Sequence, residues 1–429
     1  MLERLFKLSE NGTTVRTEVV AGLTTFLTMA YIIFVNPAIL SDTGMDRGAV
    51  FVATCLAAAI GCFIMGFVAN YPIAQAPGMG LNAFFTYAVV LGMGYSWQVA
   101  LAAVFCSGVL FILLSLFKVR EWIINSIPMS LRTGISAGIG LFLAFIALQN
   151  SGIVVDSPAT LVTLGDITSV SALLAALGFF ITVALVHRKI KGAVMIAILA
   201  VTACGLLFGD VQWHGVMSAP PSIAPTFMQL DFSAVFEIGM ISVVFSFLFV
   251  DLFDTAGTLV GVASKANLID KDGKIPRLNR ALLADSTATS IGALLGTSNT
   301  TSYVESTAGV AEGGRTGLTA VVVGVLFLLA LFFSPLAGMI PAYATSGALF
   351  YVAILMMSGL ANIEWNDITE SAPVAVTCLL MPLTYSIAEG ISFGFIAYAA
   401  IKLFSGRAKE VSLSVWVMAI IFIVKFALQ

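Results

Sequence analysis

Two carboxylates inside one hydrophobic stretch are the residues most able to do chemistry in this chain. Asp251 and Asp254, with Thr255 and Thr258, recur at i, i+3, i+4 and i+7, which places all four on one face of a helix. An ionised carboxylate inside a bilayer costs at least about 2.5–3.5 kcal/mol. Two on one face therefore predict a polar cavity and a proton carrier near neutral pH. The alternative is a structural role, in which they anchor neighbouring backbone by hydrogen bonds.

A third carboxylate, Glu305, follows the polar stretch 297–303. Ser, Thr and Asn dominate that stretch, which predicts an extended segment, and Ser306 after it opens a short helix. Glu305 is then expected in the first turn of a half-helix whose free amide groups point into a cavity. A plain helix-capping role for Glu305 is the alternative.

A second broken segment, 76–82, lies earlier in the chain. Pro72 and Pro77 remove backbone donors, so residues 73–78 are expected to be extended, with Asn82 near the start of the following helix. The Asn82 amide offers both a donor and an acceptor; packing between helices is its other possible role. Broken segments in both halves of a chain point to a substrate site at the bilayer midplane of a secondary transporter.

The elements that must position these residues are membrane helices. With 59% hydrophobic and 10% charged residues and a mean hydropathy of +1.03, the chain is too apolar for a soluble protein of its length. Apolar windows are predicted at 17–37, 49–69, 97–117, 129–149, 169–186, 190–208, 235–262, 281–296, 317–334, 342–359, 371–386, 388–404 and 411–427. With the two broken segments, they predict an all-α polytopic membrane protein of about 14 segments.

The basic residues set the topology. If the N-terminus is cytoplasmic, 18 of the 20 Lys and Arg fall on that side, which is a strong positive-inside signal. They are Arg4, Lys7, Arg16, Lys118, Arg120, Arg132, Arg188, Lys189, Lys191, Lys265, Lys271, Lys274, Arg277, Arg280, Arg315, Lys402, Arg407 and Lys409. Arg47 falls outside and Lys425 is undecided.

This threading divides the chain into two halves. Residues 1–208 hold segments 1–7, residues 209–233 form an extracellular connection, and residues 234–429 hold segments 8–14. Seven segments per half is an odd number, so the halves are inverted repeats. The surplus run 411–427 is either an added span or a helix on the rim, and an acidic connection around Glu364 departs from the charge rule.

Other patterns exclude several classes of protein. The five cysteines show no Cys-x-x-Cys spacing, so neither a metal site nor a disulfide framework is predicted. The sequence contains no phosphate-binding glycine loop and only two histidines, and no nucleic-acid footprint or removable signal peptide is recognisable. We therefore expect a protein that is not an enzyme and has no cofactor. Asp285, beside Ser286 in a span, is interpreted as structural.

The chain resembles the nucleobase/cation symporter superfamily that includes uracil, xanthine and ascorbate permeases. It is most similar to the AzgA-like branch of adenine, hypoxanthine and guanine permeases. The resemblance covers nearly the whole chain and is most specific in the blocks 76–85, 253–258 and 303–306.

This resemblance implies a core domain, about 17–117 and 234–334, that moves against a gate domain, about 129–208 and 342–429, often in a homodimer. It implies that Asn82, Asp251 and Glu305 bind the purine, with Asp254 important nearby. Proton coupling is assigned to Asp251, Glu305 and Asp254. The aromatic candidates for the face of the base are Phe84, Phe85, Phe253 and Tyr303.

The sequence therefore predicts an importer of purine bases, adenine or hypoxanthine and guanine, coupled to H+ rather than Na+ and placed in a bacterial inner membrane. An anion, ascorbate or uracil carrier of the same fold is one alternative, although such an anion site should present Lys or Arg. An ion channel with a carboxylate ring is another. The pattern does not separate adenine from the oxopurines, and it leaves the oligomeric state open.

Overall fold

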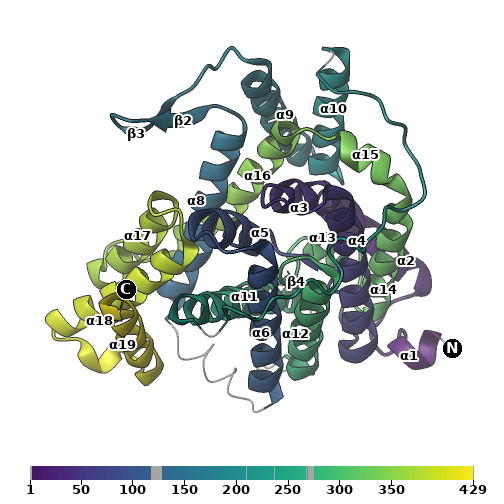
Figure 1. The fold of residues 1–429 in the computed structure, drawn as a ribbon. Helices are drawn as coiled ribbons and strands as arrows, with labels where there is room; N and C mark the ends of the chain where they lie inside the picture. The colour runs from purple at the N-terminus through teal and green to yellow at the C-terminus, as the bar shows by residue number, and fades with distance from the viewer. Residues whose placement is uncertain are drawn as a thin grey trace.

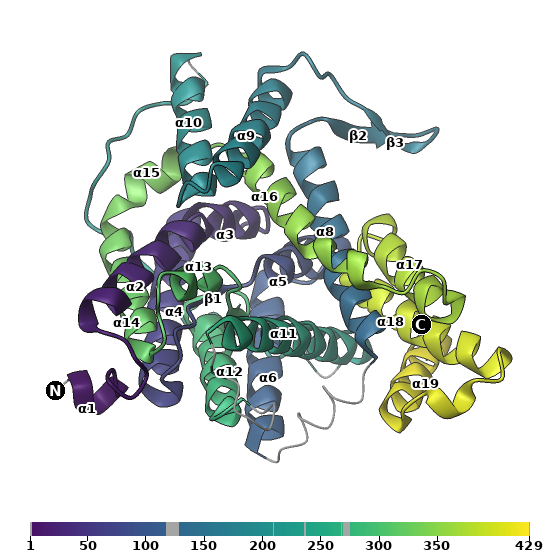
Figure 2. The same cartoon turned by 180° about the vertical axis from the view of Figure 1, so that it is seen from behind.

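The computed structural model describes residues 2–116, 128–208, 210–235, 237–266, 268 and 275–428. In these ranges the chain is almost entirely helical (Figure 1), and its two ends lie on opposite flanks of the molecule (Figure 2). The N-terminal end carries the short helix α1 (Leu2–Phe6). Four basic residues used for the topology, Lys118, Arg120, Lys271 and Lys274, lie outside the described residues.

The first repeat contains the predicted segments 1–7. Its elements are α2 (Val15–Met29), α3 (Ile32–Ser41), α4 (Arg47–Ile64), η1 (Met65–Ala69), β1 (Gln75–Pro77), α5 (Met79–Ala83), η2 (Phe84–Gly92), α6 (Trp97–Leu116), α8 (Met129–Asn150), α9 (Val170–His187) and α10 (Ala193–Leu207). Between α8 and α9, the strands β2 (Val154–Ser157) and β3 (Leu161–Leu164) form an antiparallel hairpin that the hydropathy pattern did not predict.

The second repeat contains segments 8–14 and one further helix. Its elements are α11 (Ile238–Lys265), α12 (Leu278–Leu295), β4 (Thr300–Ser302), α13 (Ser306–Ala311), α14 (Gly317–Ala330), η3 (Leu331–Phe333), α15 (Ser334–Met339), α16 (Ala342–Met357), η4 (Ser358–Asn362), α17 (Ile368–Leu383), α18 (Ile387–Phe404), η5 (Ala408–Glu410) and α19 (Leu413–Leu428).

Length and hydropathy alone identify nine membrane spans among the described residues. The other five of the fourteen predicted segments fail those criteria for visible reasons. Segments 3 and 10 are broken by β1 and β4, α10 and α17 are short, and α12 carries polar residues along its length. The predicted class, a polytopic helical membrane protein with broken segments 3 and 10, is confirmed.

Helix packing follows the inverted repeat. In the first repeat α8 corresponds to α16 of the second, and these two helices pack against each other. The contact of α8 with α17 is matched by the contact of α16 with α9, and the contact of α4 with α14 is matched by that of α6 with α12. Each contact thus has a counterpart when the repeats are exchanged.

The two broken segments cross at the centre of this arrangement. β1 pairs with β4 in antiparallel register, with Gln75 opposite Ser302 and Pro77 opposite Thr300. Two more backbone bonds extend the pair, from Gly78 N to the Asn299 carbonyl at 2.9 Å and from Tyr303 N to the Ala74 carbonyl at 3.0 Å. Through this pairing each extended segment provides the backbone hydrogen-bond partners that the other needs inside a membrane. The extended conformation predicted for residues 73–78 is confirmed.

Asp285 anchors the crossing to two helices. This fully buried side chain of α12 accepts hydrogen bonds from Ser302 Oγ at 2.8 Å, Gln75 Nε2 at 3.1 Å and Thr255 Oγ1 at 2.8 Å. Both strands and α11 are therefore bonded to one carboxylate, which agrees with the structural role predicted for Asp285.

The surplus helix α19 runs back along α18. Near its C-terminal end, Lys425 contacts Glu389 at the start of α18 at 2.9 Å. Before its N-terminal end, Glu410 contacts Lys402 near the end of α18. The two helices are thus antiparallel over most of their length, so the run 411–427 is a full helix packed on the second repeat.

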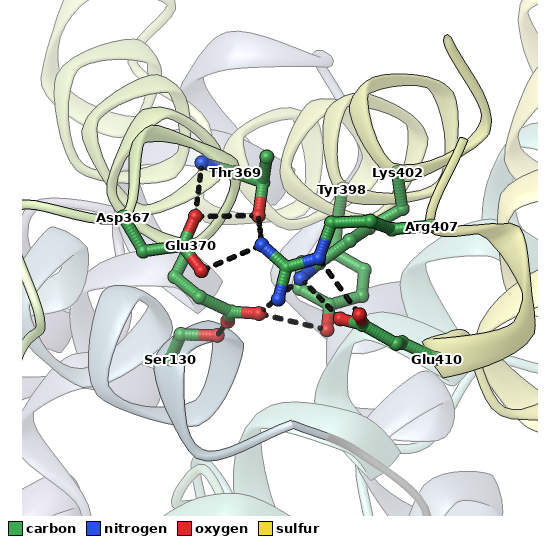
Figure 3. Close-up of polar contacts among 8 residues, drawn as sticks. All are labelled: Ser130, Asp367, Thr369, Glu370, Tyr398, Lys402, Arg407 and Glu410. Atoms are coloured by element: carbon green, nitrogen blue, oxygen red, sulfur yellow. Dashed lines mark hydrogen bonds and ion pairs between the residues drawn. The ribbon is translucent and has the colours of Figure 1, made fainter. Parts of the chain in front are cut away.

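An ion-pair network joins the α16–α17 connection to the end of α18 (Figure 3). Lys402, which is fully buried, lies 2.6 Å from Glu370 and 2.9 Å from Glu410. Arg407 contacts Asp367 and Glu410, both at 2.7 Å. The network therefore ties α17, α18 and the turn before α19 together.

This network explains the acidic connection that departs from the charge rule. The Arg407 guanidinium holds the pKa of Asp367 well below its ordinary value, so Asp367 stays ionised at neutral pH. Glu370 is neutralised by Lys402. The acidic connection lies on the same side of the molecule as the basic end of α18, and the basic residues come from α18 rather than from the connection itself.

We predict that Asp285→Asn lowers the free energy of unfolding by about 2 kcal/mol. The amide replaces one accepting oxygen by an NH2 donor and removes the negative charge, and hydrogen bonds to charged groups contribute roughly 1.5–3 kcal/mol each. Thermal unfolding of the purified protein in detergent measures the change. Asp156→Asn, at an exposed position of β2, is the matched control. An unchanged unfolding midpoint for Asp285→Asn would contradict the anchoring role.

A second prediction concerns Lys402. Lys402→Met leaves Glu370 and Glu410 without their buried partner, and we expect destabilisation of roughly 2 kcal/mol, less than for a fully buried pair because both carboxylates keep some contact with water. Adding Glu370→Gln to Lys402→Met should recover part of the loss, as a double-mutant cycle in thermal unfolding would show. Lys7→Met, which breaks the exposed pair with Glu10, should have little effect.

Candidate functional site

Glu305 lies at the start of the short helix α13, directly after the strand β4. The residue is partly exposed, and its Oε1 accepts a hydrogen bond of 2.5 Å from the phenol of Tyr31. Tyr31 lies between α2 and α3 of the first repeat and is 1% exposed. The expected position of Glu305 in the first turn of a half-helix is therefore observed, and its donor comes from the other repeat.

Asp254 lies on α11 and faces Glu305. The residue is partly exposed; its carboxylate hydrogen-bonds to the Thr301 side chain and interacts electrostatically with Glu305 and Asp285. The strand residue Thr301 thus stands beside the two carboxylates. Of the predicted residues, Asp254 and Glu305 are the pair that the structure brings together.

Asp251, one turn earlier on α11, is placed deeper. It is fully buried, and its Oδ2 accepts hydrogen bonds of 3.1 Å from both Thr289 Oγ1 and Asn299 Nδ2. Thr255 Oγ1 lies 3.5 Å from its other oxygen. The shared helix face predicted for Asp251 and Asp254 is observed, but Asp251 bonds into the layer formed by α12 and the residue before β4.

Asn82 lies on α5, at the other end of the crossing. Its side chain is fully buried, and its Oδ1 accepts a hydrogen bond from the Ser298 hydroxyl. Its Nδ2 has no hydrogen-bond partner among the described residues. β1 ends at Pro77, shortly before Asn82, and β4 ends at Ser302, shortly before Glu305. Because the strands are antiparallel, Asn82 and Glu305 come after opposite ends of the ladder. The hydrogen bonds place Asn82, Asp251 and Glu305 in three separate groups.

The aromatic candidates have mixed positions. Phe84 and Phe85 are fully buried, and the ring of Phe84 packs edge-on against Phe247 of α11 at 5.0 Å between centroids. Tyr303 is 5% exposed and donates a hydrogen bond of 2.5 Å to the Pro77 carbonyl, across the crossing. The side chain of Phe253 lies outside the described part of the structure.

Two tyrosines near Glu305 were missed by the sequence analysis. Tyr31 occurs in an apolar run without a nearby Gly, so nothing in the sequence marks the break between α2 and α3 at this position. Tyr351 of α16 is partly exposed and close to Glu305. It belongs to the predicted gate segments, and its position depends on how α16 packs.

The arrangement can bind a ligand that carries several N–H donors. The carboxylates of Asp254 and Glu305 can accept hydrogen bonds. The Asn82 amide, at the other end of the ladder, can donate one only to a ligand that reaches it. Among the described residues, no group of three or more His, Cys, Asp and Glu side chains is placed to hold a metal ion. The polar groups at the site are thus suited to hydrogen-bond recognition of a small polar molecule.

Solved structures with the same fold are membrane transporters. The transmembrane domain of the cyanobacterial bicarbonate transporter BicA matches with a TM-score of 0.66, covering 87% of this chain and 96% of that domain, at 16% sequence identity. The murine anion transporter Slc26a9, solved in an inward-facing state, matches with a TM-score of 0.65 over 91% of this chain and 69% of its own, at 11% identity. At these identities the likeness concerns the fold alone.

Sequence relatives are much more similar. The adenine permease AdeP of Escherichia coli K12 is 53% identical over 425 residues, covering 99% of this chain and 96% of AdeP. The guanine/hypoxanthine permease PbuG of Bacillus subtilis is 49% identical over 437 residues, covering 99% of both chains. The nucleobase transporter PlAzg2 of Paenibacillus larvae is 36% identical over 90% of this chain and 77% of its own. Residues 16–393 match the Permease family model Xan_ur_permease, so the predicted resemblance is confirmed and the chain belongs to this permease family.

Proposed function

We propose that this protein imports purine bases, adenine or hypoxanthine and guanine, together with protons. The relatives named above are permeases for adenine and for guanine and hypoxanthine. A purine base presents N–H donors beside ring-nitrogen acceptors, and a site with two carboxylates and one amide has the complementary groups.

The observation that carries the proposal is the pairing of Asp254 with Glu305 beside the strand crossing. Both residues are partly exposed, whereas Asp251 is fully buried and accepts hydrogen bonds from Thr289 and Asn299. This placement favours Asp254 and Glu305 as the groups that accept N–H donors of the base. Asp251, which the sequence analysis assigned to the substrate, then holds Asn299 and the residues before β4 in position.

Proton coupling follows from the same pair. A neutral base carries no charge, so its accumulation requires a co-transported cation. Two neighbouring carboxylates repel each other when both are ionised, which favours a state in which one of them holds a proton. We propose that this proton enters from outside with the base and leaves with it to the cytoplasm.

Alternating access is the third part of the proposal. Asn82 and Asp251 are fully buried, so a base can reach Asn82 only when helices move apart. We propose that the predicted core domain, which carries Asn82, Asp254 and Glu305, moves against the predicted gate domain, which carries Tyr351. Such movement of one part against the other around a fixed site is general for transporters with inverted repeats.

We further propose that the N-terminus is cytoplasmic, which is supported by the distribution of Lys and Arg. The ion-pair network supports the same orientation, since it places the acidic α16–α17 connection beside Lys402 and Arg407. The homodimer implied by the family resemblance stays a prediction.

An anion carrier is the main competing function, because the solved structures of the same fold include anion transporters. Such a site needs positive side chains or amide groups. Among the described residues, the side chains found around Asp254 and Glu305 are hydroxyls and other acids, not Lys or Arg. The local charge therefore opposes an anion and favours a ligand rich in donors.

We predict that Glu305→Gln and Asp254→Asn each reduce uptake of radiolabelled adenine, hypoxanthine or guanine at least about tenfold, because each removes a charge-assisted hydrogen bond of roughly 1.5–3 kcal/mol. Asp231→Asn, on an exposed loop, serves as control. Purine uptake by Glu305→Gln at the rate and KM of the unmodified protein would contradict the proposed site.

The coupling ion gives a separate prediction. Accumulation of a labelled purine by cells expressing the protein should increase as external pH falls, collapse with a protonophore and persist when choline replaces Na+. Exchange of internal for external purine should survive the protonophore, because exchange needs no net driving force. A requirement for Na+ at every pH would refute proton symport.

A further inference from the structure

The hydrogen bond between Tyr31 and Glu305 joins the two repeats at the candidate site. The phenol donates to Glu305 Oε1 at 2.5 Å, which is in the range of short bonds to charged oxygen acceptors. Tyr31 is 1% exposed, whereas Glu305 is partly exposed. The phenol is therefore the buried partner of a residue that is itself partly exposed.

A break in the first segment sets the position of Tyr31. α2 ends at Met29 and α3 begins at Ile32, so Tyr31 lies at the junction of two helices. This junction puts the phenol within hydrogen-bond distance of Glu305 at the start of α13.

The other titratable groups that face Glu305 do not provide an equivalent bond. Asp254 of α11 is an acid and repels a second negative charge. Tyr351 of α16 faces Glu305 from the other domain. Tyr303, two residues before Glu305, gives its own phenol to the Pro77 carbonyl. Among the described side chains, the donor bonded to Glu305 is the phenol of Tyr31.

We propose that Tyr31 is a positioning residue that fixes which oxygen of Glu305 meets the substrate and carries the proton. This inference rests on the proposed function and deepens it. Because the phenol is a donor, it keeps Oε1 as an acceptor in both protonation states of Glu305. Oε2 is then the oxygen that binds the proton when Glu305 carries it, and the oxygen that accepts an N–H of the base when the proton is on Asp254.

The phenol also sets the pH at which Glu305 changes its protonation state. A donor bonded to a carboxylate stabilises the ionised form relative to the protonated form. Without the phenol, Glu305 beside Asp254 would hold its proton to higher pH. Tyr31 thus helps Glu305 to release its proton to the cytoplasm.

The test is an infrared titration of the purified protein without substrate. The carboxyl C=O band of Glu305 is identified by its absence in Glu305→Gln and is then followed against pH. In Tyr31→Phe we expect its midpoint about one pH unit higher, a roughly tenfold change in the protonation equilibrium. Tyr71→Phe removes another buried phenol, whose partner is the Pro276 carbonyl, and should leave the midpoint unchanged.

A folded Tyr31→Phe protein with the unmodified midpoint would overturn the inference. If Tyr31→Phe fails to fold, 3-fluorotyrosine at position 31 replaces it, because the ring keeps its size and the more acidic phenol is a stronger donor. The midpoint should then move to lower pH, and no movement would refute the role of Tyr31. Since the titration needs no purine, its result stands apart from the uptake assays that test the proposed function.

Discussion

The structure depends on one constraint, which is that extended backbone inside a bilayer must find hydrogen-bond partners within the protein. Two segments of this chain leave the helical conformation, and neither could stay in lipid alone. β1 and β4 meet that requirement by pairing with each other, extended by the bonds of Gly78 and Tyr303. Because the strands come from different repeats, this pairing locks the repeats together. The helix starts of α5 and α13 are thereby placed at opposite ends of the ladder.

The carboxylates around the crossing divide into two groups by depth. Asp285 and Asp251 are fully buried and are surrounded by hydroxyl and amide donors from α12, α11 and the strands. They stabilise the crossing. Asp254 and Glu305 are partly exposed and close together, and this pair is where a ligand with N–H donors and a proton can be bound. Asp251 and Asp254 thus differ in role although both lie on α11. Asp251 is in a buried environment, and Asp254, one helical turn later, is in a partly open one.

Away from the strand crossing, acidic residues of the second repeat are paired with basic residues. Lys402 and Arg407 from the end of α18 neutralise Glu370 and Asp367 of the preceding connection. Lys425 similarly neutralises Glu389. Each pair brings together residues from consecutive or neighbouring helices of the second repeat. These contacts fix the helices of the predicted gate segments to one another.

The sequence by itself determined the class of protein, the number of segments, the two breaks and the identity of the acidic residues, because hydropathy, Pro, Gly and charge are local properties of the chain. It predicted residues 73–78 as extended and Glu305 at the start of a half-helix, and both are observed. Only the tertiary structure decided that Asp254 stands beside Glu305, that Thr289 and Asn299 donate to Asp251, and that Tyr31 donates to Glu305. Those facts depend on the rotation of α11 and on contacts between residues far apart in the chain, 274 positions for Tyr31 and Glu305. No local pattern encodes them, since a helical period gives the shared face of Asp251 and Asp254 but not their depth.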